Sequence, residues 1–212
     1  LQLLAEKLIA SPKPFAAVFF SLATHDHAGN YVPQTFGGIE KKFPEDSYLR
    51  ALAYTDWSIG QFIQTLKQNN LYENTVFVIT ADHRDRLSPH DTLKEGFHIP
   101  LAIYAPNVLP AKRIHIVAGQ ADLLPTLVDL FHIQAPYSAL GNSLLDKHAP
   151  RFAFFSYMAG EHFGLTNQQG MVLEDENLFP EQQTPKGDQI RYCALALNRT
   201  AYDLLQSNHW FK

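Results

Sequence analysis

Two residues whose side chains can bind a metal ion, Asp82 and His83, directly follow a strongly apolar stretch of the sequence. That stretch, residues 75–81, reads TVFVITA. It is rich in β-branched and aromatic residues with almost no alternation, which is typical of a strand buried on both faces. In open parallel sheets, ligands bind beyond the carboxyl ends of strands. Because a carboxylate and an imidazole together can bind a divalent ion, the sequence predicts half of a metal site at Asp82 and His83.

A structural interpretation of the same pair stays open, in which an aspartate caps a strand-to-loop turn beside a surface histidine. His98 adds to the metal-site interpretation, because it returns to the same edge just before a second apolar run, residues 99–105. His98 has its own structural alternative, a core histidine that donates a hydrogen bond to a backbone carbonyl.

A further polar cluster, Thr-His-Asp-His at residues 24–27, follows another unbroken apolar run, FAAVFFSL at residues 15–22. Side chains two positions apart in an extended segment point to the same face, so His25 and His27 could share a face that Asp26 opposes. One of these histidines could then bind an anionic oxygen or a metal ion, and the other would be a solvated loop residue. A second polar cluster at a second strand end favours the functional interpretation of Asp82 and His83.

The elements that would position these side chains form a β–α–β unit. Residues 15–22 and 75–81 are the predicted strands, and the apolar stripe within residues 47–68 predicts a long helix between them. A unit of this kind is expected to be right-handed. The remaining predicted elements are helices at 2–10 and 120–131 and strands at 99–105, 114–117 and 152–157. Together they predict an α/β domain with a mostly parallel sheet.

The sequence changes character near residue 161. Beyond it, short strand-like pieces at Gly170–Leu173 and at 192–197 are separated by a polar linker, 174–188. The predicted organisation is therefore one domain over residues 1–160 and a small β-rich C-terminal extension over residues 161–212.

Composition excludes several classes of protein. The 212 residues are 46% hydrophobic and 18% charged, as in an ordinary globular protein. A net charge of −4 without a basic run argues against a nucleic-acid partner. No stretch has the length and apolar character of a membrane span, and the single Cys193 excludes an internal disulfide.

There is no glycine-rich phosphate loop and no Gly-x-Ser-x-Gly turn of a serine hydrolase. The start at Leu1, without an initiator methionine, indicates a piece of a longer protein.

Taken together, these clusters form part of an ordered series of short motifs. The series resembles the C-terminal part of the sulfatase family, within the alkaline phosphatase superfamily, and is most similar to the branch of lipoteichoic acid synthases and phosphoglycerol transferases. The matching motifs are Lys13-Pro14-Phe15, residues 23–27, Tyr54-Thr55-Asp56, Ala81-Asp82-His83, His98-Ile99-Pro100-Leu101 and residues 120–127, QADLLPTL.

The resemblance implies an α/β/α sandwich around a mostly parallel sheet, with the site at the carboxyl ends of the strands. It implies that Asp82 and His83 are ligands of a divalent ion, either Mn²⁺, Mg²⁺, Ca²⁺ or Zn²⁺. His27 matches a substrate-binding histidine of the family, and His98 matches a histidine near the site of some members. His25 is the alternative to His27 as the residue that faces the substrate.

The function that the resemblance implies is hydrolysis or transfer of a phosphate or sulfate ester, possibly linked to a lipid or glycan, by a metal-dependent enzyme. The family's nucleophile lies upstream of the matched region, so this chain supplies no nucleophile, and we expect it to be inactive without the upstream half of the domain. The resemblance also implies an extracytoplasmic location and a membrane anchor outside this chain. The alternative from a different class is a non-catalytic binding or interaction module that keeps the fold.

Overall fold

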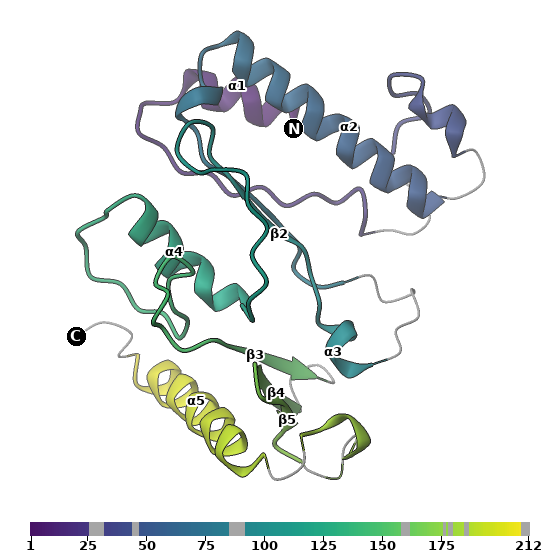
Figure 1. The fold of residues 1–212 in the computed structure, drawn as a ribbon. Helices are drawn as coiled ribbons and strands as arrows, with labels where there is room; N and C mark the ends of the chain where they lie inside the picture. The colour runs from purple at the N-terminus through teal and green to yellow at the C-terminus, as the bar shows by residue number, and fades with distance from the viewer. Residues whose placement is uncertain are drawn as a thin grey trace. The chain divides into compact units, whose positions relative to one another are not determined.

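Two compact units make up the computed structural model, which describes residues 1–25, 32–43, 47–84, 92–157, 162–175, 177, 180–184 and 187–208. The first unit comprises Leu1–Ile79 and Leu101–Ala111, and the second comprises Thr80–Pro100 and Lys112–Lys212. Figure 1 shows the course of the chain through helices and strands of both units. The predicted α/β class is therefore confirmed.

The first unit is built on two helices at the positions that the sequence predicts, α1 (Gln2–Ala10) and α2 (Ser47–Gln68). Ala5 of α1 and Leu66 of α2 are buried together with Leu71, and Phe77 packs against this cluster. Phe77 begins β1 (Phe77–Thr80), which pairs with β2 (Leu101–Tyr104) in a two-stranded sheet. Both strands are shorter than predicted. Two single turns of 3₁₀ helix, Ile39–Lys42 and Tyr72–Asn74, complete this unit.

The apolar run at residues 15–22, predicted to be a central strand, belongs to neither sheet. Its large side chains are exposed, with Val18 at 86% and Phe20 at 74% of full accessibility. Apolar composition alone does not make a strand, because a strand needs neighbours that accept its backbone hydrogen bonds.

The second unit contains a three-stranded antiparallel sheet in the order β3 (Phe152–Tyr157), β4 (His162–Asn167) and β5 (Gly170–Leu173). Its helices are α3 (Leu93–Gly96), α4 (Leu123–Leu130) and α5 (Asp188–Ser207), with 3₁₀ turns at Gln120–Asp122 and Pro180–Gln182. Pro125 lies in the first turn of α4, where a backbone N–H has no partner within the helix.

Side chains on the two faces of this sheet pack against different helices. Val172 and Leu165 are buried with Ile190 and Ala194 of α5, whereas Met171 and Leu173 are buried with Phe155 and with Leu93 of α3. Successive residues of β5 therefore point to opposite faces, as the pleat of a strand requires. The result is a layer of sheet covered by α5 on one side and by α3 on the other.

Two further predicted strands are wrong. Residues 192–197 lie inside α5, because Ile190, Ala194 and Leu197 recur at helical spacing and face the sheet. Residues 114–117 form no strand. The predicted boundary at residue 160 falls between β3 and β4, which pair with each other from Phe152↔Asn167 to Tyr157↔His162. The division of the chain into domains stays a prediction.

Candidate functional site

Asp82 and His83 lie immediately beyond the end of β1, where the sequence predicts them. Both side chains are open to solvent, with exposed fractions of 67% and 50%. The backbone N–H of His83 donates to Asp82 Oδ1 over 2.9 Å, and His83 Nδ1 lies 2.6 Å from the carbonyl oxygen of Arg84. A carbonyl oxygen only accepts hydrogen bonds, so His83 Nδ1 carries the proton. His83 Nε2 is then the nitrogen with a free lone pair.

This arrangement fits two ligand positions around one ion. His83 Nε2 and Asp82 Oδ2 are 3.6 Å apart. Two atoms bound to the same ion at about 2.1 Å, with a tetrahedral angle between them, lie roughly 3.4 Å apart. A ligating histidine whose other nitrogen donates to a carbonyl is the usual arrangement at protein metal sites. Within the described ranges, however, no three His, Cys, Asp or Glu side chains gather into a group that could hold a metal ion.

The backbone at Asp82 is held by the side chain of Gln120, a residue far away in the sequence. Gln120 Nε2 donates to the carbonyl oxygens of Ala81 over 2.9 Å and of Asp82 over 3.1 Å. Thr80 Oγ1 donates to the carbonyl of Pro100 over 2.9 Å and closes the base of the loop that leads towards β2. The QADLLPTL motif begins with Gln120, but the sequence alone gives no role for this side chain.

His98 follows α3 and is exposed. Thr92 and Glu95 close the first turn of α3 with a capping box, in which each side chain accepts from the other residue's backbone N–H. Phe97, the neighbour of His98, lies 4.4 Å from the ring of Phe155 between centroids. The position of His98 is therefore fixed by packing of α3 on the sheet, and the alternative of a buried core histidine is not observed.

His25 is exposed in the first unit, where its backbone N–H donates to the carbonyl oxygen of Leu22 over 3.2 Å. His27 lies outside the described residues. The substrate-binding roles predicted for His25, His27 and His98 stay predictions.

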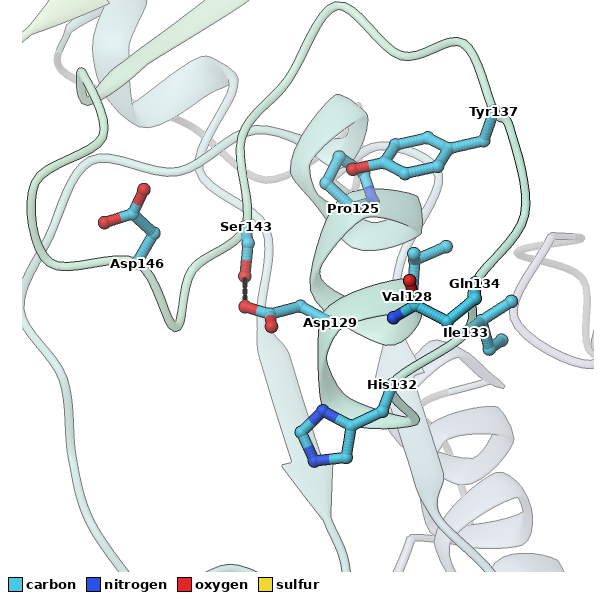
Figure 2. Close-up of a pocket in the computed structure, with 9 residues that line it drawn as sticks. All are labelled: Pro125, Val128, Asp129, His132, Ile133, Gln134, Tyr137, Ser143 and Asp146. Carbon is cyan, nitrogen blue, oxygen red and sulfur yellow. Dashed lines mark hydrogen bonds between the residues drawn. The ribbon is translucent and has the colours of Figure 1, made fainter.

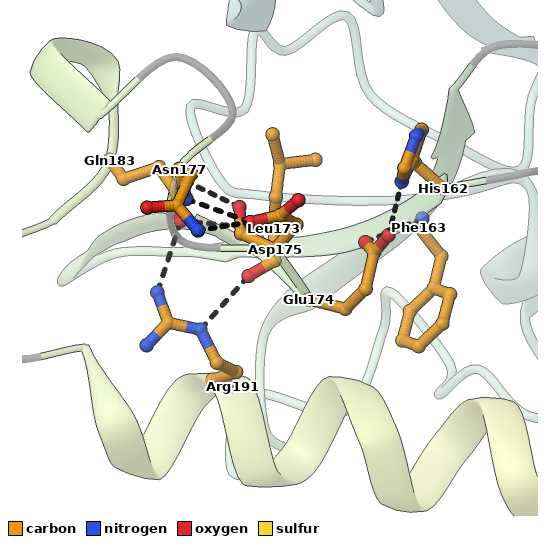
Figure 3. Close-up of polar contacts among 8 residues, drawn as sticks. All are labelled: His162, Phe163, Leu173, Glu174, Asp175, Asn177, Gln183 and Arg191. Carbon is orange, nitrogen blue, oxygen red and sulfur yellow. Dashed lines mark hydrogen bonds and ion pairs between the residues drawn. The ribbon is translucent and has the colours of Figure 1, made fainter.

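A histidine–carboxylate hydrogen bond that the sequence does not predict joins β4 to the residue after β5. His162 Nδ1 lies 2.6 Å from Glu174 Oε1, and Glu174 Oε2 accepts from the backbone N–H of Phe163 over 2.8 Å (Figure 3). Glu174 is 12 positions from His162 in the sequence, and the register of the β4–β5 hairpin brings the two together.

Comparison with known proteins identifies the family. A sequence model of the sulfatase family matches residues 1–133, and this chain therefore belongs to the sulfatase family. An arylsulfatase of Clostridium perfringens is 28% identical over 183 residues, covering 79% of this chain and 38% of that protein. The lipoteichoic acid synthase-like protein YvgJ of Bacillus subtilis is 25% identical over 205 residues, covering 82% of this chain and 33% of that protein.

The fold is similarly identified by solved structures. A Vibrio parahaemolyticus protein of the alkaline phosphatase superfamily matches with a TM-score of 0.71 and 23% identity, covering 98% of this chain and 53% of that chain. The resemblance inferred from the motifs is thus confirmed. The chain spans less than two fifths of the length of the two curated relatives. Within the part of the chain that the structure describes, none of the helices is both long and apolar enough to cross a membrane.

Proposed function

We propose that Asp82 and His83 supply two ligands of a divalent-metal site in an enzyme that hydrolyses or transfers phosphate or sulfate esters. The observation that carries this proposal is the free Nε2 of His83, fixed by the carbonyl of Arg84 at 3.6 Å from Asp82 Oδ2. The mixed oxygen and nitrogen ligands suit Mn²⁺, Mg²⁺, Ca²⁺ or Zn²⁺ to different degrees. Membership of the sulfatase family supports the class of reaction.

When bound, the ion would polarise the ester oxygen and lower the pKa of the attacking hydroxyl. Residues of this chain would hold the ion and the substrate for that reaction. Asp82 and His83 would hold the ion, and His98 with His27 or His25 would bind the oxygens of the anionic group. Gln120 would keep the Asp82 backbone in one orientation through its two hydrogen bonds.

The rest of the site would come from polypeptide outside this chain, including the nucleophile and further metal ligands. The partner of this chain is then the upstream half of the same domain, and the 212 residues alone would turn over neither an aryl phosphate nor an aryl sulfate. Lipid- or glycan-linked esters are the substrates that we favour. We further propose an extracytoplasmic location with a membrane anchor outside this chain.

Calorimetric titration with Mn²⁺ and with Zn²⁺ tests the metal site without any need for activity. We expect weak, saturable, one-site binding by the wild-type chain and none by Asp82→Ala. Asp146→Ala is the matched control, because Asp146 is also an exposed aspartate that accepts from a nearby histidine's backbone, His148 N, over 2.8 Å. Equal metal binding by the wild type and by Asp82→Ala would show that Asp82 is not a metal ligand.

A non-catalytic binding module is the second candidate. The two candidates separate in the full-length protein. An enzyme would lose turnover of aryl esters on Asp82→Ala, whereas a binding module would show no turnover before the substitution.

A further inference from the structure

A pocket of about 310 Å³ lies along α4, away from the sequence motifs that carry the metal chemistry. Figure 2 shows its lining side chains on α4 and on the segment that follows it. The chain reverses where α4 ends. His132 has a left-handed backbone with φ of 51°, and the N–H of Ile133 donates to the carbonyl of Val128 over 2.9 Å. This turn folds residues 133–146 back along the helix.

Hydrogen bonds from one face of α4 hold the returning segment. Asp122 Oδ1 accepts from the N–H of Asn142 over 2.7 Å, and Thr126 Oγ1 accepts from the N–H of Leu144 over 2.9 Å. One turn further along, Asp129 Oδ2 accepts from the hydroxyl of Ser143 over 2.6 Å. Because these contacts recur at helical spacing, both walls of the pocket are fixed before any ligand binds.

The polar side chains of the lining are available to a ligand. His132, Gln134 and Tyr137 are exposed, and no hydrogen bond of their side chains is found in the described part of the chain. Asp129 uses one carboxylate oxygen for Ser143, and Asp146 uses one for the N–H of His148. Each aspartate thus keeps a second oxygen that can accept a hydrogen bond.

The charge of the lining selects the type of ligand. Asp129 and Asp146 contribute two carboxylates, and none of the described lining residues is a lysine or arginine. Arg151, which lies nearby, is engaged with backbone carbonyls of Ser143 and Asp146. A sulfate or phosphate group would be repelled here, so this pocket does not suit the anionic group of the proposed reaction.

From these contacts we infer that the pocket binds an uncharged sugar unit. The exposed ring of Tyr137 and the side chain of Val128 offer apolar surface to the face of a sugar ring. The free oxygens of Asp129 and Asp146 accept from neighbouring hydroxyl groups, and the amide of Gln134 can both donate and accept. Such a site recognises a carbohydrate portion of a ligand, and it requires neither a metal ion nor the proposed ester chemistry.

The test is NMR titration of the 212-residue chain in the presence of EDTA with glucose, N-acetylglucosamine and glucose 6-sulfate. Millimolar dissociation constants are expected from so few contacts, so concentrations up to about 20 mM suffice. The inference predicts that a neutral sugar shifts the ring signals of Tyr137 and His132, while glucose 6-sulfate binds at least about tenfold more weakly because of the carboxylates.

Two variants locate the binding. Tyr137→Ala and Asp146→Ala should each weaken sugar binding about tenfold or more, since each removes a direct contact. Tyr192→Ala is the matched control, because Tyr192 on α5 is 72% exposed and lies outside the pocket. Absence of binding by both neutral sugars overturns the inference. So does binding that survives in both pocket variants, or binding of glucose 6-sulfate as tight as that of glucose.

Discussion

Gln120 holds the backbone on both sides of the Ala81–Asp82 peptide by donating from one nitrogen to two successive carbonyl oxygens, at 2.9 and 3.1 Å. The two residues of this contact are separated by 38 positions in the sequence. The orientation of the proposed metal ligand therefore depends on the chain segment that begins the 3₁₀ turn before α4.

Replacing Gln120 with Met keeps the length of the side chain and removes both hydrogen bonds. Two such bonds at a partly exposed place are worth about 1–2 kcal/mol in total, so we expect metal affinity to fall roughly tenfold. Hydrogen exchange at the backbone N–H of His83 should become faster in the metal-free chain, which reports loop order independently of activity. Gln169→Met is the control, because Gln169 is exposed in the β4–β5 turn. Unchanged exchange at His83 would contradict this positioning role.

Asp122 is a buried carboxylate whose loss should destabilise the fold. It is 5% exposed, and it accepts from the backbone N–H of Gly119 over 2.9 Å and of Asn142 over 2.7 Å. Asp122→Ala leaves both N–H groups without their acceptor, and we expect a loss of about 2–4 kcal/mol in the free energy of unfolding. Urea denaturation measures this loss. Asp203→Ala should cost at most about 0.5 kcal/mol, because the Asp203 side chain forms an ion pair with Arg199 that is exposed to solvent.

Glu40 should make the first unit sensitive to acid. The backbone N–H of Phe36 donates to its carboxylate over 3.0 Å, and this bond lowers the pKa of Glu40 below its ordinary value. A lowered pKa means that the folded state favours the ionised form. Its contribution to stability is therefore complete above the unfolded-state pKa, about 4.3, and is lost as the pH falls through the folded-state pKa.

Chemical denaturation of the wild type and Glu40→Gln at a series of pH values measures this contribution. The wild type should be the more stable at pH 7, and the difference should shrink below about pH 4.3. A difference that stays constant from pH 7 to pH 3 would show that ionisation of Glu40 is not its source.

The parts of the structure that the sequence predicts well are those encoded by local periodicity. The stripe of α2 and the composition of β1 and β2 locate the Asp82-His83 loop correctly. The sequence-based predictions fail where contacts between residues far apart in the sequence determine the structure. Residues 192–197 have an apolar composition that fits a strand, but their neighbours continue the helical face that packs on β4 and β5. The Gln120–Asp82 and His162–Glu174 contacts leave no periodic signal, since each depends on how separate segments pack.

Gly164 in the middle of β4 is required by the close approach of two neighbours. A Cβ atom at this position would lie 2.5 Å from the carbonyl oxygen of Val172 and 2.6 Å from the ring of Phe155. The backbone of β5 cannot move aside without breaking its pairing with β4, in which Gly164 opposes Leu173. Gly164→Ala should therefore destabilise the second unit by about 1–3 kcal/mol through overpacking.

Gly60 provides a control for this substitution, because replacing it with alanine should change the stability in the opposite direction. It lies inside α2, and apart from its chain neighbours and the nearby helix backbone, no atom of the described residues lies within 4 Å of the position that a Cβ would occupy. Gly60→Ala should stabilise the helix by about 0.5–1 kcal/mol, because alanine has the higher helix propensity and restricts the unfolded chain. Thermal unfolding followed by circular dichroism compares the two variants. A Gly164→Ala chain as stable as the wild type would mean that β4 and β5 are less closely packed than the structure describes.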